Sequence, residues 1–230
     1  MENAIVSSSS PVTCIGGSDA SPTELHAALK FAPIVVAADG GAELAMQAGV
    51  ELSAVIGDFD SIPKSVLLQV PESKRHHVAE QMSTDFEKVL MRVDAPVLVG
   101  IGFLGGRLDH ELAAFHALLA FADKPCILMN AAQIVFLAPP KIALPAHAGE
   151  VVSLFPLCKV EGRSSGLTWP IDGLAFAPGH QIGTSNSATG PIEIEIDRPG
   201  MLMILPARFV TSVIAALVMP DRARWPARAR

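Results

Sequence analysis

The first 140 residues alternate short apolar runs with segments that carry helix signals. The apolar runs have the length and β-branched composition of buried strands. Strands that alternate with helices predict a mostly parallel sheet with helices on both of its faces. We therefore expect residues 1–140 to form an α/β domain. The runs are PVTCI, PIVVAA, SAVIG, KRHHV, APVLVGI, PCILM and AQIVFL.

Capping signals place the helices between these runs. Ser21 with Glu24, and Thr84 with Glu87, have the spacing of a capping box, in which two side chains satisfy the free N–H groups of a helix start. These boxes predict helices from residue 22 to about 30 and from residue 85 to about 92.

The composition changes after Pro139-Pro140, where short strand-like runs are separated by glycine and proline. Isoleucine alternates with acidic residues over 192–197, which is typical of a half-buried antiparallel strand. The last apolar run, ARFVTSVIAALVM, also has the composition of a strand. We expect residues 141–230 to form a C-terminal all-β domain, a small β-sandwich.

Composition and charge limit the partners. The 230 residues carry a net charge of −6, which gives no global attraction to nucleic acid or to an anionic membrane, so we expect neither partner. Three cysteines without a CxxC pair indicate reduced thiols and a cytoplasmic location. The apolar stretch 201–219 is interrupted by Pro206 and Arg208, which argues against a membrane span. The basic tail DRARWPARAR is expected to be a solvated chain end.

Asp58 and Asp60 lie two residues apart in VIGDFDSI, on a turn after an apolar run. Two carboxylates this close repel each other unless a cation lies between them, and oxygen ligands suit Mg²⁺. A solvated, Asp-rich turn that caps a helix would give the same spacing.

Asp85 and Lys88 share a face near the predicted helix start after Thr84. A helix N-terminus beside a lysine can hold a phosphate, and Asp85 could be a third metal ligand. A capped surface helix with a local ion pair is the alternative.

Two glycine turns complete the polar clusters. In GGRLDH, Arg107 offers a fork for phosphate oxygens, and Asp109 and His110 begin the next helix. In ADGG, Asp39 and Gly40 follow a strand and are candidate ligand contacts; Asp39 could bind a nucleotide sugar or cap a helix. All the clusters follow predicted strands, and ligands of parallel sheets bind at the carboxyl ends of the strands.

The second domain contributes one aromatic candidate. Trp169 precedes a proline in GLTWPI and could stack on a flat heterocycle, or it could belong to the β core. The chain contains no GxxxxGK[ST], GxSxG or HExxH motif. This excludes a P-loop nucleotide-binding enzyme, a hydrolase with a nucleophile elbow and a zinc metalloprotease of the HExxH type.

The motifs ADGGA, GDFDSI, STDFEKVL, GGRLDH, GLTW and TSN follow one another in an order that resembles the thiamine pyrophosphokinases. The resemblance spans about Ala37 to Asn186 as separate blocks. It implies an α/β domain, a β-sandwich and a homodimer with active sites at the interface. The implied reaction transfers pyrophosphate from ATP to the hydroxyl of thiamine and leaves AMP.

The resemblance also implies roles for single residues. Asp58, Asp60 and Asp85 match the Mg²⁺ ligands, and Lys88 and Arg107 would stabilise developing charge. The implied ligand-binding residues are Gln81 and Thr84 near phosphate or metal, Arg107, Asp109 and His110 at the nucleotide phosphates, Trp169 stacked on thiamine, and Ser185 and Asn186 near its pyrimidine.

Two other functions fit the same residues. A pyrophosphokinase for another heterocyclic alcohol, such as a hydroxymethylpterin, would use the same metal cluster with a different acceptor pocket. A non-enzymatic sensor of nucleotide or thiamine would bind these ligands without turnover.

Overall fold

In the computed structural model, which describes residues 4–219 and 223–227, the chain forms a mixed α/β fold of two compact units. Unit 1 contains residues 1–117 and 128–131, and unit 2 contains residues 118–127 and 132–230. The predicted domain boundary at residue 140 stays a prediction. Helix α5 (Leu108–Ala120) and strand β8 (Cys126–Met129) contribute residues to both units.

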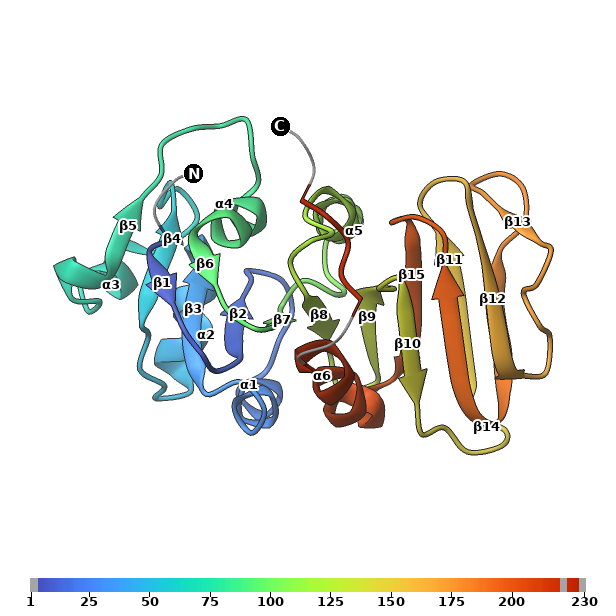
Figure 1. The fold of residues 1–230 in the computed structure, drawn as a ribbon. Coiled ribbons are helices and arrows are strands. Elements are labelled where there is room, and N and C mark those ends of the chain that lie inside the picture. The colour runs from blue at the N-terminus through green and yellow to red at the C-terminus, as the bar shows by residue number, and fades with distance from the viewer. Residues whose placement is uncertain (1–3, 220–222, 228–230) are drawn as a thin grey trace. The chain divides into compact units, whose positions relative to one another are not determined.

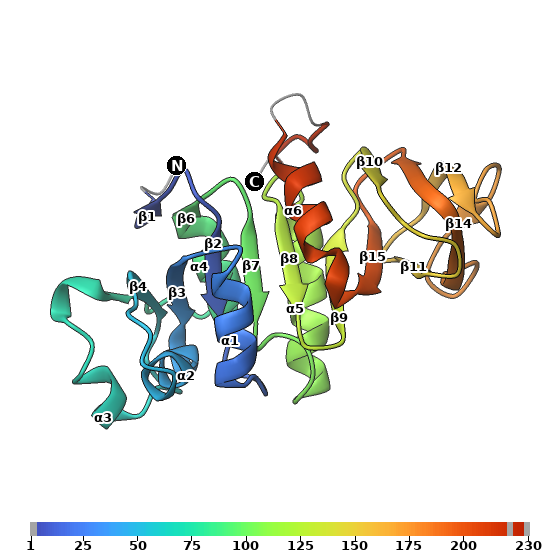
Figure 2. The same cartoon turned by 90° about the horizontal axis from the view of Figure 1, so that it is seen from below.

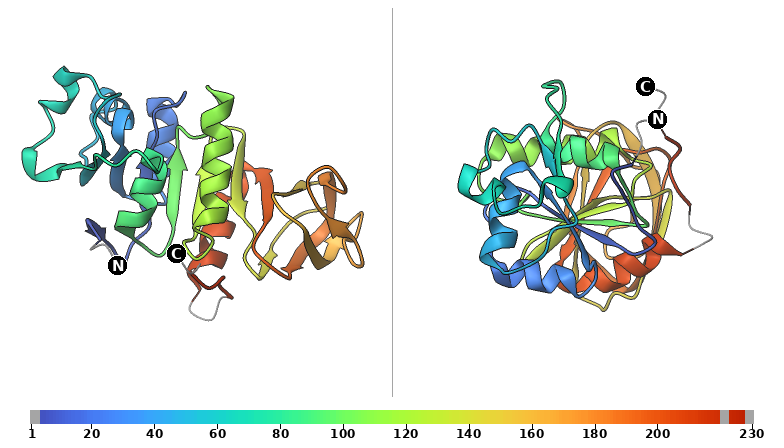
Figure 3. Two further views of the ribbon diagram at one scale, coloured as in Figure 1. Left: turned by 90° about the horizontal axis from the view of Figure 1, so that it is seen from above. Right: turned by 90° about the vertical axis from the view of Figure 1, so that its left-hand side faces the viewer.

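A parallel sheet is the centre of unit 1, with its strands in the order β7-β2-β3-β4-β5 (Figure 1). Helices α1 and α2 pack on one face of this sheet and α4 packs on the other (Figure 3). The strands are β1 (Val6–Ser7), β2 (Val12–Ile15), β3 (Ile34–Ala38), β4 (Ala54–Gly57), β5 (Arg75–His77), β6 (Val93–Asp94) and β7 (Leu98–Ile101). The helices are α1 (Pro22–Leu29), η1 (Asp39–Gly41), α2 (Ala42–Gln47), α3 (Lys64–Leu67), η2 (Glu72–Lys74) and α4 (Asp85–Arg92).

Both predicted capping boxes are confirmed. Ser21 and Thr84 each accept a hydrogen bond from the backbone N–H three residues later, and the glutamates at those positions bind back to the cap N–H groups. A capping side chain is worth about 1 kcal/mol, so these boxes fix where α1 and α4 begin. The start of α4 matters most, because its first turn carries Asp85 and Lys88.

Unit 2 is mainly antiparallel. Strands β9, β15, β11, β14, β12 and β13 pair in that order, and β10 pairs with β14. The alternation over 192–197 has the predicted effect, since Ile192, Ile194 and Ile196 are buried and the acidic residues between them are not. The strands are β9 (Gln133–Leu137), β10 (Lys141–Leu144), β11 (Val151–Pro156), β12 (Val160–Leu167), β13 (Ala175–Phe176), β14 (Gly183–Ile196) and β15 (Met201–Pro206). The predicted sandwich arrangement stays a prediction.

The prediction of an all-β second domain is wrong for residues 207–218. They form η3 (Ala207–Phe209) and α6 (Val210–Val218), and α6 packs against β10 (Figure 2). The buried residues Phe209, Val213 and Leu217 recur every four residues, which is a helical spacing. The β-branched residues of this run favoured a strand in the sequence analysis, so the helical spacing of its apolar residues was not recognised. Among the described residues, no helix combines the length and the apolar character needed to cross a membrane.

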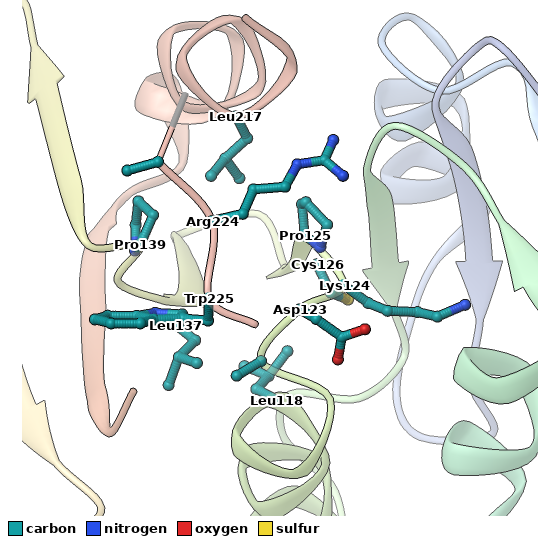
Figure 4. Close-up of a pocket in the computed structure, with 12 residues that line it drawn as sticks. Leu118, Asp123, Lys124, Pro125, Cys126, Leu137, Pro139, Leu217, Arg224 and Trp225 are labelled. Carbon is teal, nitrogen blue, oxygen red and sulfur yellow. The ribbon is translucent and has the colours of Figure 1, made fainter. Parts of the chain in front are cut away.

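The chain end is partly anchored. Residues 221–222 and 228–230 of the expected solvated tail lie outside the described residues, but Trp225 is half-buried and donates from Nε1 to the carbonyl oxygen of Ala138 over 2.8 Å. Trp225 lines a small cavity of about 30 Å³, shared with Cys126, Leu137 and Leu217 (Figure 4). The indole therefore covers apolar surface that residues 118–139 would otherwise expose.

Replacing Trp225 with alanine should increase the rate at which a thiol reagent modifies Cys126 by about tenfold or more, an effect of about 1.4 kcal/mol in local opening. Cys126 is 5% exposed, and burial raises the pKa of its thiol, so it reacts only when the surroundings open. Alkylation followed by peptide mass spectrometry measures the rate. Buried Cys14 of unit 1 is the internal reference. Equal rates of Cys126 modification in the original protein and in Trp225→Ala would contradict the proposal that the indole covers this surface.

Candidate functional site

Two neighbouring parallel strands bring Asp39 and Asp58 to the same sheet edge. Strand β3 ends at Ala38 and β4 ends at Gly57, and Ala38 is paired with Ile56 in the register of the two strands. An aspartate follows the last residue of each strand, Asp39 after Ala38 and Asp58 after Gly57, and both lie at the carboxyl edge, where parallel sheets bind ligands.

Three carboxylates converge there. Each of Asp39, Asp58 and Asp60 offers an oxygen that lies within 4.8 Å of the other two. Asp58 and Asp60 were predicted as ligands of one ion, and the structure brings them together. The third member is Asp39, which the sequence left as a sugar contact or a helix cap. Asp39 is only 2% exposed, whereas Asp60 faces solvent.

One carboxylate oxygen of Asp39 is buried without a hydrogen-bond partner among the described residues. Its Oδ2 accepts a hydrogen bond from the N–H of Ser61 over 2.9 Å, but its buried Oδ1 has no hydrogen-bond partner among the described residues. Burial is the largest cause of the raised pKa of Asp39, and the charges of the neighbouring aspartates raise it further. An unpartnered acidic oxygen beside two other carboxylates fits a hard divalent cation, which takes oxygen ligands.

Gly57 makes room for Asp39. A Cβ atom on Gly57 would lie 2.8 Å from the Cβ of Asp39, so any side chain there would displace Asp39. The sequence reasoning missed Gly57. Its one signal is a glycine at the last position of a buried strand, immediately before Asp58.

Lys88 is the positively charged partner of the aspartates at this edge of the sheet. It is 1% exposed, and its Nζ donates to Asp58 over 3.1 Å and to Asp85 over 2.9 Å. Burial alone would lower the pKa of Lys88, but these hydrogen bonds and charges outweigh it and raise the pKa. Asp85, predicted as the third metal ligand, is thus joined to Asp58 through Lys88.

Gln81 and Thr84 lie on the chain between β5 and α4. The Nε2 of Gln81 donates to Asp58 over 2.7 Å, which places it beside the carboxylates. Thr84 is the N-cap of α4, and its Oγ1 accepts from the N–H of Glu87 over 3.3 Å. Burial would raise the pKa of Asp58, but the bonds from Lys88, Gln81 and the N–H of Asp60 lower it.

The GGRLDH loop follows β7 and leads into α5. Gly105 and Gly106 have φ angles of 82° and 71°, which other residues rarely adopt. Arg107 donates to both carboxylate oxygens of Asp109, over 3.1 and 2.6 Å. His110 lies in the first turn of α5, which begins at Leu108, and its N–H donates to Oδ1 of Asp109. The predicted phosphate fork is therefore exposed and paired with Asp109. Gly40, another predicted contact, lies in η1 beside Asp39.

Unit 2 has an open hollow of about 500 Å³, a size typical of small-molecule sites. Trp169 forms part of its wall and is 61% exposed, so it is not the core residue that the sequence left open. Leu174 and Ile182 are exposed apolar residues of the same wall.

Asn186 and Ser185 support this wall in different ways. Asn186 is buried, donates to the carbonyl of Trp169 over 2.7 Å and accepts from the N–H of Trp169 over 3.2 Å. Its amide therefore holds the backbone of Trp169. Ser185 is exposed in the hollow with a φ of 59°, and its N–H donates to Oγ of Ser153 over 2.9 Å.

Comparisons with known proteins agree with this geometry. The family model "Thiamin pyrophosphokinase, catalytic domain" matches residues 25–129, and "Thiamin pyrophosphokinase, vitamin B1 binding domain" matches residues 141–201. "Thiamin pyrophosphokinase 1" of Caenorhabditis elegans is 29% identical over 175 residues, which is 67% of this chain and 71% of that protein.

Solved structures share the fold. Thiamin pyrophosphokinase from Candida albicans has a TM-score of 0.73 at 16% identity and covers 86% of this chain and 89% of its own. The protein from Geobacillus thermodenitrificans has a TM-score of 0.71 at 23% identity and covers 85% and 96%. Because the two family models together match well over half of the residues, this chain belongs to the thiamin pyrophosphokinase family of enzymes.

Proposed function

We propose that this enzyme transfers pyrophosphate from ATP to the hydroxyl of thiamine in the presence of Mg²⁺, and releases thiamine diphosphate and AMP. The observation that carries this proposal is the group of Asp39, Asp58 and Asp60, with a buried carboxylate oxygen that lacks a partner. The names of the matched family models and relatives support the choice of thiamine as acceptor.

The three clustered aspartates would hold the metal ion, since carboxylate oxygens are the ligands that Mg²⁺ prefers. Bound there, Mg²⁺ would neutralise charge on the phosphate oxygens of the donor. Asp85 remains a predicted ligand, and its Oδ1 accepts a hydrogen bond from Nζ of Lys88.

Basic side chains would supply the rest of the charge neutralisation. Lys88 is fixed by two carboxylates, so its ammonium needs no reorganisation when the phosphates arrive. The side chain of Arg107 is 70% exposed and paired with Asp109 at the surface, so exchanging that partner for phosphate oxygens costs little. Transfer of a phosphoryl group depends mainly on positioning and charge stabilisation, and these residues provide both.

The hollow beside Trp169 would bind thiamine. The exposed indole can stack on a flat ring and attract the cationic thiazolium, and the apolar wall can cover the rest of the molecule. Asn186 would then act through Trp169 by fixing its backbone, and Ser185 would offer its hydroxyl to the ligand.

Measuring AMP release from ATP with and without thiamine tests this function. We expect release that needs both thiamine and Mg²⁺ and that falls in Asp58→Asn. AMP release with a hydroxymethylpterin in place of thiamine would instead identify a pyrophosphokinase for another heterocyclic alcohol. Binding of both ATP and thiamine without AMP release would identify a non-enzymatic sensor.

Two further proposals need experiments of their own. Sedimentation of the full chain would test the proposed homodimer, and cell fractionation would test the proposed cytoplasmic location.

Replacing Trp169 with alanine should raise the KM for thiamine about 5- to 30-fold, with kcat changed less than about twofold. Loss of an aromatic ring that makes a cation–π contact with the ligand costs about 1 to 2 kcal/mol of binding free energy. Trp169→Phe, which keeps a smaller aromatic face, should fall between the alanine variant and the original protein. Steady-state kinetics at saturating ATP measures this. A loss confined to kcat would remove Trp169 from the thiamine site.

A further inference from the structure

The backbone of Phe59 has an unusual conformation. Phe59 lies between Asp58 and Asp60 and has a φ of 65°, in the left-handed region that side chains with a Cβ rarely adopt. This conformation costs about 1 to 2 kcal/mol for an ordinary residue. Asp39, with a φ of 42°, is a second such residue in the same cluster. Strained residues persist only where surrounding contacts hold them.

The bend at Phe59 connects the three aspartates. After the bend, the N–H of Asp60 points back to Oδ1 of Asp58 over 3.3 Å. The N–H of Ser61 donates to Oδ2 of Asp39 over 2.9 Å. An extended Phe59 would move both N–H groups away, so the left-handed conformation sets the spacing of the carboxylates.

A ring contact with His77 holds Phe59. The centroids of the two rings are 5.4 Å apart and their planes are tilted by 51°, a geometry typical of stabilising aromatic pairs. His77 is fixed opposite Gly57 in the register of β4 and β5, and the N–H of Val78 donates to the carbonyl of Gly57 over 2.7 Å. His77 therefore stands at the point where β4 ends and the acidic turn begins.

We propose that His77 is a positioning residue of the metal site: its ring packs on Phe59 and keeps the left-handed turn that spaces Asp58 and Asp60. This inference rests on the proposed function, since it assumes that these aspartates hold a divalent ion. The role needs an aromatic face at position 77 and no proton or ligand atom of the imidazole.

Titration of the full-length, metal-free protein with Mn²⁺, followed by electron paramagnetic resonance without nucleotide, tests the proposal. His77→Ala should weaken Mn²⁺ binding about 10- to 100-fold, the usual loss when a residue that orients a metal ligand is removed. His77→Phe keeps a ring and should bind within about threefold of the original protein. In turnover, His77→Ala should raise the half-saturating Mg²⁺ concentration and leave kcat at saturating Mg²⁺ nearly unchanged.

A double-variant cycle ties the effect to Phe59. Phe59→Leu should weaken Mn²⁺ binding as His77→Ala does, and combining the two should add little, because both remove the same contact. Melting curves verify that each variant is folded, and the exposed position of His77 favours this.

The outcomes separate this inference from the proposed function. Unchanged Mn²⁺ binding in Asp58→Asn would overturn the metal site, and the role of His77 with it. Lost binding in Asp58→Asn together with full binding in His77→Ala would overturn the positioning role alone. Binding in His77→Phe as weak as in His77→Ala would show that the imidazole itself is needed, which also overturns it.

Discussion

Replacing Asp39 with asparagine should make the metal-free protein more stable at neutral pH and, in the same variant, lower Mg²⁺-dependent turnover about 100-fold or more. The expected loss exceeds the 10- to 100-fold range of residues that only orient a ligand, because Asp39 would be a ligand itself. The gain in stability follows from burial: the carboxylate is 2% exposed, and its Oδ1 has no partner within the described chain.

Asparagine suits this position in two ways. It tolerates a positive φ better than most residues, and Asp39 has a φ of 42°. Its amide oxygen can still accept from the N–H of Ser61, while its NH₂ group can donate to the neighbouring carboxylates, whose oxygens lie within 4.8 Å. The substitution thus replaces a repulsive contact with an attractive one.

The pH dependence has a definite sign. Because the pKa of Asp39 is raised in the folded state, the folded protein binds its proton more tightly, and stability is lost as the pH rises from the ordinary aspartate pKa through the raised one. The advantage of Asp39→Asn should therefore be greatest at neutral pH and disappear below about pH 4.

Thermal melting of metal-free protein, paired with AMP release, measures both effects. Asp94→Asn, at an exposed position on β6, is the control and should change neither. Lower stability of Asp39→Asn at neutral pH would contradict the charge-repulsion account, and full turnover would remove Asp39 from the metal site.

Replacing Lys88 with methionine should destabilise the metal-free protein by about 3 kcal/mol or more, because a buried ion pair that loses one partner leaves an uncompensated charge. The side chains of Lys88 and Asp58 are only 2% and 11% exposed, and both Asp58 and Asp85 would lose their cation. The loss corresponds to about 6 °C or more in melting temperature for a chain of this size. Turnover should also fall about 100-fold.

Lys74→Met is the matched control, since it removes a lysine from the exposed pair with Glu51, where the effect should stay within about 1 kcal/mol. Added Mg²⁺ should restore part of the stability of Lys88→Met, because a bound cation can replace the ammonium. The pKa of Asp58 is lowered, so the stability that this pairing contributes is present above the ordinary aspartate pKa and is lost as the pH falls through the lowered one. A loss as small as that of Lys74→Met would contradict the buried-pair account.

The sequence was informative where signals are local. The two capping boxes and the apolar runs predict α1, α4 and the strands β2, β3, β4, β5 and β7, because each depends on residues within a few positions, whereas the two-residue strands β1 and β6 were not predicted. The strand predicted over 207–219 is wrong for residues 207–218, since valine and isoleucine at buried positions satisfy a helix as well as a strand when tertiary packing decides.

Two features that the sequence did not predict, the place of Asp39 among the clustered carboxylates and the contact of His77 with Phe59, depend on pairing between distant segments. Asp39 joins Asp58 because β3 lies beside β4 in a particular register, and His77 reaches Phe59 because β5 lies beside β4. No local pattern specifies either register. The left-handed conformations of Asp39 and Phe59 are likewise invisible in sequence, since neither is glycine.

At Gly57 of this chain, one added methyl group should separate an effect on catalysis from an effect on folding. A Cβ there would meet the Cβ of Asp39 at 2.8 Å, while the rest of β4 could pack unchanged in the sheet. The Gly57→Ala variant of this chain should therefore express as an intact protein without turnover, that is, as a pseudoenzyme.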